Sequence, residues 1–219
     1  MPGTVVGTYF SHPRNHGRAA TVCLGVALGL FFIAGPMDMG WIPDLSGSMS
    51  QLQNGQVWRL WTLLLAHKDL EHLGSNLVVL LPFMYALLRH FQRWLIFFLA
   101  FLSAGMSDFL TMFRLPPDTQ LLGVSGLAYW AAGAWLTLFI LIDTTKSLRR
   151  RLAYAIFLMS VLLIPHEYSP SVSYSNHLWG LIFGVVSGLF LFLVYRRRIK
   201  TAEILYFDPD EELDGGTAA

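Results

Sequence analysis

The chain has 219 residues, of which 54% are hydrophobic and only 13% charged, and its formal net charge is +1. With a mean hydropathy of +0.51, it is too apolar for an ordinary soluble domain and is predicted to be an integral membrane protein in contact with lipids. The charge gives no indication of a nucleic-acid partner. The single cysteine, Cys23, excludes an intrachain disulfide and a cysteine-based metal site.

Six apolar segments follow one another along the chain, and most approach the roughly 17–25 residues that cross a hydrocarbon core. We therefore expect an all-α bundle of six transmembrane helices at about residues 19–35, 73–88, 94–113, 121–142, 152–165 and 178–195. The expected organisation is a cytoplasmic N-terminal segment (1–18), a membrane domain (19–198) and an acidic cytoplasmic tail (199–219).

Basic residues predict the orientation of this bundle, because they favour the cytoplasmic side of short loops. Twelve of the 15 Lys and Arg residues lie in alternate connections, namely before the first segment, between the second and third, between the fourth and fifth, and after the sixth. Both termini are therefore predicted to be cytoplasmic. The loops 36–71, 114–120 and 166–176 would face the outer side, and the expected location is a bacterial inner membrane.

A serine and a histidine are expected at the outer ends of the fourth and sixth helices. Small residues on one helical face allow close helix approach in lipid, so the two helices should pack with Ser125 and His177 at similar depth. The small residues are Gly126, Ala128, Ala132 and Gly133 on the fourth helix and Gly180, Gly184 and Gly188 on the sixth. An imidazole beside a hydroxyl suits a general base and a nucleophile. Gly-x-Ser-Gly alone is more often a packing motif.

A third polar cluster lies at the start of the second segment. His72 and Asn76 are four residues apart and share one helical face. Both side chains can donate hydrogen bonds, as an oxyanion hole requires, although an interhelical polar clamp would use the same pair. Tyr129 follows Ser125 by one turn and is expected to pack against the imidazole of His177.

These motifs, in this order, resemble the rhomboid intramembrane serine proteases of the compact six-helix bacterial type. The resemblance covers the chain from Trp58 to about Tyr195 and rests on His67, His72, Asn76, Gly123-x-Ser125-Gly126, Tyr129 and His177-x-x-Gly180-x-x-x-Gly184. It implies a Ser-His dyad in which Ser125 is the nucleophile and His177 the general base. It also implies that the oxyanion donors are His72, Asn76 and the Ser125 backbone N–H.

The resemblance further implies supporting roles. Tyr129 would pack on the histidine ring, Gly180 and Gly184 would let the two catalytic helices meet, and His67 would be structural. Trp58 and Arg59 match a pair in the family's first outer loop. The implied substrates are single-pass transmembrane proteins cleaved near the outer end of their span, and neither metal nor organic cofactor is implied. The rhombosortase branch, which acts on glycine-rich C-terminal membrane anchors, remains an alternative.

Two residues depart from the family pattern, and other classes of protein compete. Asn176 stands where the family usually has a small residue, and Asp108 is unusual within the third segment. A rhomboid-like protein that binds membrane clients without cutting them is the main alternative. A zinc protease is disfavoured because His67 and His72 are five residues apart and lack the i, i+4 ligand spacing. A transporter would more typically show inverted repeats.

Overall fold

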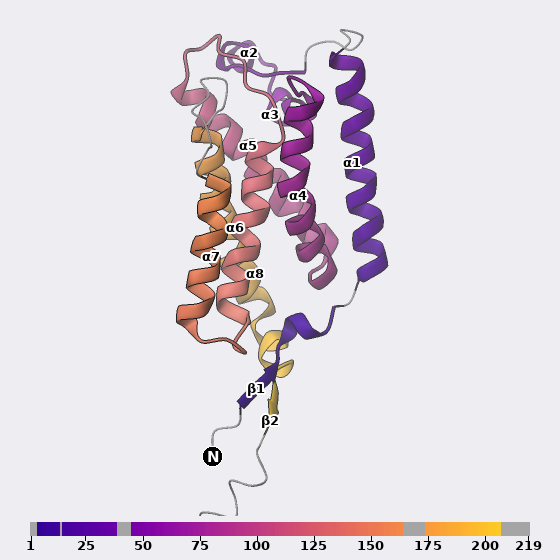
Figure 1. Cartoon of the computed structure of the whole chain (residues 1–219). Helices are drawn as coiled ribbons and strands as arrows, with labels where there is room; N and C mark the ends of the chain where they lie inside the picture. Colours follow the sequence, from indigo (N-terminus) through magenta and orange to yellow (C-terminus); the bar gives the residue numbers. More distant parts are fainter. Residues whose placement is uncertain (1–3, 14, 39–44, 164–173, 207–219) are drawn as a thin grey trace, which may run out of the picture.

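The computed structural model describes residues 4–13, 15–38, 45–163 and 174–206, and these are mostly helical (Figure 1). Each of the six apolar segments forms a long helix. Two short helices, α2 and α3, precede α4, and 3-10 turns lie at Tyr9–Ser11 and Leu63–Leu65. The helices are α1 (His16–Asp38), α2 (Met49–Gln53), α3 (Arg59–Thr62), α4 (Leu70–His90), α5 (Arg93–Arg114), α6 (Ser125–Ile142), α7 (Leu148–Leu163) and α8 (Tyr174–Thr201).

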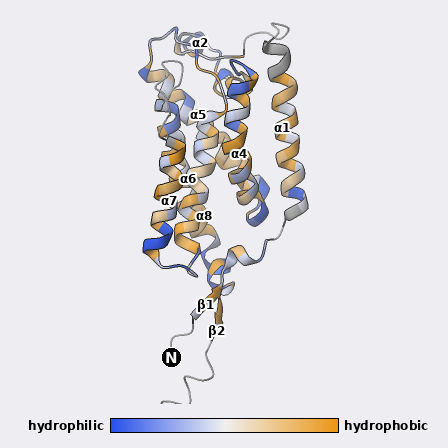
Figure 2. Cartoon of the chain, in the orientation of Figure 1, coloured by the Kyte–Doolittle hydropathy of each residue, from blue (hydrophilic) through white to orange (hydrophobic). Residues whose placement is uncertain are grey.

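Four of these helices, α4, α5, α6 and α8, are long and apolar enough to cross a membrane. Apolar residues run along the helices, while hydrophilic residues gather towards their ends (Figure 2). The described apolar part of α1, Gly17–Ile33, is shorter, and α7 has 16 residues. The chain is therefore a helical integral membrane protein, and the count of six membrane crossings stays a prediction.

Helix α6 occupies the centre of the bundle. Of its apolar span 67% is buried, compared with 28–50% for the spans of α4, α5 and α8. Its packing partners include α4, α5, α7 and α8. Trp130 is fully buried and its indole N–H donates to the hydroxyl oxygen of Ser187 on α8 at 2.9 Å. This buried bond fixes the register between the two helices.

Helices α6 and α8 meet through their backbones. A Cβ added to Gly180 would collide with the main chain of Gly126, and one added to Gly184 would meet the carbonyl oxygen of Trp130 and the Ala134 nitrogen, the latter at 3.0 Å. The contacts advance in the same direction along both helices, so the helices run parallel. Close approach of this kind maximises van der Waals packing, which drives helix association in lipid.

The start of α6 differs from the expected segment 121–142. The helix begins at Ser125, because Gly123 has a φ of +104° and Leu121 is paired with Gly47 in an isolated antiparallel bridge. Neither conformation continues a helix. Ser125 is therefore the first residue of the helix rather than the fifth.

The chain ends also depart from a purely helical fold. Thr4–Gly7 (β1) and Ile204–Tyr206 (β2) form a two-stranded antiparallel sheet, with Val5 opposite Leu205. This pairing is possible because α1 begins and α8 ends at the same end of the bundle (Figure 1). The rest of the predicted acidic tail, residues 207–219, lies outside the described residues. So do the last two residues of the fifth apolar segment (164–165) and residues 166–173 of the third predicted outer connection.

We expect Gly184→Ala to lower the melting temperature of the detergent-solubilised protein, because the added methyl group meets main-chain atoms of α6 that cannot rotate away. Overpacking of this kind costs about 1–3 kcal/mol. Gly29→Ala in α1 is the matched control, since nothing lies within 4 Å of its Cβ position. Equal melting temperatures for the two variants, measured by circular dichroism, would contradict the backbone contact.

Candidate active site

The backbone before Ser125 is held by two hydrogen bonds from neighbouring segments. The Gly123 N–H donates to the Leu63 carbonyl at 2.9 Å, and the Val124 N–H donates to Nε2 of His67 at 3.4 Å. The φ of +104° at Gly123 is accessible to glycine and costly for other residues. These restraints place Ser125, which is 8% exposed, at the N-terminus of α6. There its backbone N–H has no partner within the helix.

His67 acts as a structural acceptor. Because Nε2 accepts from Val124, the ring proton lies on Nδ1, which is 3.4 Å from the Leu65 carbonyl oxygen. Burial lowers the pKa of His67 to about 4, partly offset by the bond to Leu65. The neutral ring therefore persists at pH 7 and keeps the segment before Ser125 in place.

His72 and Asn76 lie against Gly123. A Cβ built on Gly123 would be 3.1 Å from Cε1 of His72 and 3.7 Å from Nδ2 of Asn76. The side chain of Asp69 accepts a bond from the His72 backbone N–H at 2.7 Å and so fixes the start of α4. The buried Nδ2 of Asn76 has no hydrogen-bond partner among the described residues. Among the described residues, an unpaired donor thus lies beside Gly123, two residues before Ser125.

His177 lies flat against Tyr129. Their ring centroids are 4.2 Å apart with an interplanar angle of 13°, and Tyr174 meets the imidazole edge-on at 6.2 Å. The Tyr129 hydroxyl donates to the Leu162 carbonyl of α7, so three helices orient the imidazole. The described part of the chain contains no hydrogen bond between Ser125 and His177. Such bonds often form only in the substrate complex of an enzyme.

A buried polar layer adjoins these residues. Asn176 is 1% exposed, and its amide occupies the space beside Gly126, where a Cβ would be 2.7 Å from the amide oxygen. Asp108 on α5 is equally buried and faces Asn176. Within the described chain, neither side chain has a well-aligned hydrogen bond. The sequence singled out both residues as departures, but their contact joins segments almost 70 positions apart and no local pattern predicts it.

Arg59 contacts the segment that precedes α2, where its Cβ is 3.3 Å from the Cβ position of Gly47. The Arg59 guanidinium donates to Oε1 of Gln56 at 2.6 Å and to the Ser46 carbonyl. Its neighbour Gly47 exchanges two backbone bonds with Leu121, at 2.9 and 2.7 Å. Arg59 therefore braces the strand-like contact that leads into α6. The Trp58 side chain is exposed.

The fold and this site define a helical integral membrane protein that carries a serine and a histidine at neighbouring helix ends. The family model for the rhomboid domain matches residues 54–194, a range that includes every candidate site residue. The chain belongs to the rhomboid family, which is a family of intramembrane serine proteases that act on transmembrane substrates. The resemblance inferred from the motifs is thus confirmed for the family, whereas the branch stays a prediction. No curated protein matches the chain.

His67 should couple the stability of the protein to pH. Its folded pKa is about 4 and its ordinary value 6.5, so between these values the unfolded chain binds a proton that the folded chain does not. Its contribution is complete above about pH 6.5 and is lost as the pH falls towards 4. We expect the melting temperature of the wild type to fall more steeply over this range than that of His67→Leu.

At pH 7.5 the same variant should be less stable than the wild type, because the Val124 N–H loses its acceptor. An unsatisfied buried donor costs about 1–3 kcal/mol. Val78→Ala, on the exposed face of α4, is the control and should keep the wild-type slope, because it removes no titratable group. A His67→Leu slope equal to that of the wild type would show that His67 is not the titrating group.

Proposed function

We propose that the protein is an intramembrane serine endopeptidase with a Ser125–His177 dyad. The observation that carries this proposal is the placement of the His177 ring on Tyr129, one helical turn after Ser125. The contact between Gly126 and Gly180 supports it, because these glycines are one residue after Ser125 and three after His177. His177 accepts the Ser125 proton as the hydroxyl attacks the peptide carbonyl, and then donates it to the leaving amine. The acyl-enzyme is hydrolysed by a water that His177 deprotonates.

The oxyanion that forms in each step needs hydrogen-bond donors aimed at it. We assign this role to the backbone N–H of Ser125 and the side chains of His72 and Asn76. Three features support the assignment: Ser125 begins α6, His72 and Asn76 lie beside Gly123, and the buried Asn76 amide has no partner among the described residues. An unpaired donor is ready for the transition state without first breaking a bond.

The proposed substrates are single-pass transmembrane proteins, cleaved near the end of the span that reaches the site. The site lies at the end of the bundle opposite to β1 and β2 (Figure 1). The clustered arginines lie at the β1–β2 end, and such residues favour the cytoplasmic side. We therefore propose six membrane crossings, cytoplasmic termini, and a site that opens to the outer side of a bacterial inner membrane.

Labelling with a fluorescent fluorophosphonate tests the dyad, because this probe reacts with an activated serine. We expect labelling of the wild type in detergent and its loss in both Ser125→Ala and His177→Ala. Ser160→Ala, on α7, is the control and should label as the wild type does. No labelling of folded wild type would contradict the proposal and favour the client-binding alternative, since binding requires no activated hydroxyl.

Asn76→Ala tests the oxyanion assignment separately. Removing one such donor typically lowers turnover about 10²- to 10³-fold. Its stability should change little, because the amide donor has no hydrogen-bond partner to lose within the described structure. Turnover is measured on a single-pass transmembrane reporter in liposomes, with Val78→Ala on the exposed face of α4 as the control. Unchanged turnover in a folded Asn76→Ala protein would exclude the amide from the oxyanion site.

A further inference from the structure

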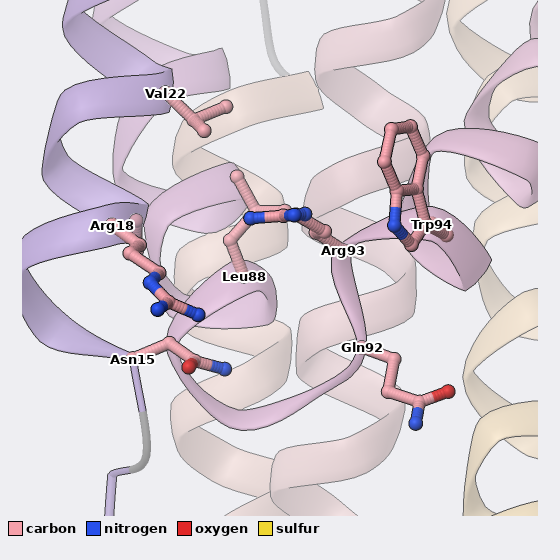
Figure 3. A pocket seen from close by; sticks show the side chains of 8 residues that line it. Asn15, Arg18, Val22, Leu88, Gln92, Arg93 and Trp94 are labelled. Carbon is pink, nitrogen blue, oxygen red and sulfur yellow. The ribbon is translucent and has the colours of Figure 1, made fainter.

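A cavity of about 290 Å³ opens at the end of the bundle opposite the candidate active site. It lies between the start of α1, the end of α4 and the start of α5 (Figure 3). Arg18 and Arg93 approach it from the two sides, with the amides of Asn15 and Gln92 below them. Apolar side chains close the rest: Ala19, Val22, Leu88 and Trp94.

The polar part of this cavity is strongly cationic. No acidic side chain lines it, and in the described chain neither Arg18 nor Arg93 forms an ion pair. Arg93 lies 5.2 Å from the centre of the Trp94 ring, a contact that leaves its N–H groups available. Two unpaired guanidinium groups and two amides supply the donors that a phosphate group binds best.

The helix termini around the cavity favour an anion as well. Both α1 and α5 begin here, so the positive ends of two helices of 23 and 22 residues border the same space. The Gln92 side chain does not cap α5. The opposing negative end of α4 is largely satisfied, because its Arg89 and His90 carbonyls accept from the Asn15 N–H and the Tyr9 hydroxyl. The local field therefore remains positive.

An apolar surface leads away from the cavity along α5. Trp94 is 73% exposed, and Phe98 and Phe101 follow on the same helical face with 57% and 52% exposed. In a membrane protein such a face lies against hydrocarbon chains. The cationic donors therefore lie where a lipid headgroup would lie, and the aromatic face extends from them as acyl chains extend along the membrane normal.

We propose that this cavity binds the phosphate of an anionic phospholipid, with its acyl chains along the Trp94–Phe98–Phe101 face of α5. Arg18 and Arg93 hold the phosphate oxygens, Asn15 and Gln92 bind the polar headgroup, and Val22 and Leu88 contact the glycerol end of the chains. The bound lipid links α1 to α5, which otherwise pack mainly on α4 and α8 respectively. This inference does not depend on the proposed protease activity.

Native mass spectrometry of the full-length protein in detergent tests the proposal. Dioleoyl phosphatidylglycerol should bind with at least tenfold higher affinity than dioleoyl phosphatidylcholine. Arg18→Gln/Arg93→Gln should lose about tenfold or more of the phosphatidylglycerol affinity, on the basis of the attraction of each basic residue for an anionic lipid. Arg149→Gln/Arg150→Gln is the matched control, because it removes two exposed arginines from the same end of the bundle without touching the cavity.

Val22→Trp gives an independent variant, since it fills the cavity and keeps both arginines. It should weaken phosphatidylglycerol binding while its melting temperature stays near that of the wild type. Equal losses in the Arg18/Arg93 and Arg149/Arg150 variants would overturn the proposal in favour of diffuse attraction to all basic residues. Displacement of the lipid by millimolar inorganic phosphate or glycerol phosphate would show a site for the free anion and would exclude a lipid site. Equal affinity for the two phospholipids would also overturn it.

Discussion

The backbone contact between α6 and α8 is the constraint on which the rest of the structure depends. In lipid the hydrophobic effect does not drive helices together. Their association depends on van der Waals packing and hydrogen bonds, both of which require close approach. Gly180 rests on the main chain of Gly126, and the Trp130–Ser187 bond fixes the register one turn further along. A larger residue at Gly180 would separate the helix that begins at Ser125 from the helix that carries the imidazole.

The same serine is restrained from the other side by segments that precede α4. Gly123 adopts a positive φ, and the neutral ring of His67 accepts from the next backbone N–H. Neither restraint uses the hydroxyl of Ser125. The Gly123 backbone and the His67 ring thus hold the segment that leads into Ser125. In the proposed reaction, a nucleophile held in this way would need little reorganisation.

The sequence predicts those features of the fold that depend on residues close together in the chain. The six helices and the glycine face of α8 depend on hydropathy and on the helical period, both of which are local, so the sequence indicated them. The stacking of Tyr129 on His177 could also be inferred, once the glycine face of α8 was packed against the start of α6. The pairing of Gly47 with Leu121, the β1–β2 sheet and the meeting of Asp108 with Asn176 join distant segments without any periodic pattern, and only the structure brings them together. The catalytic roles remain predictions, because geometry alone does not demonstrate a reaction.

Asp108 and Asn176 form a buried polar layer in which the two side chains face each other inside the bundle. Burying a polar group costs free energy unless it is hydrogen-bonded, so such groups are uncommon among apolar helices. The layer lies against Gly126 and one residue before His177, in the region where α6 and α8 pack most closely. Close backbone packing and the polar layer therefore meet beside the imidazole. Buried polar side chains inside an otherwise apolar bundle are typical of functional sites rather than of cores selected for stability alone.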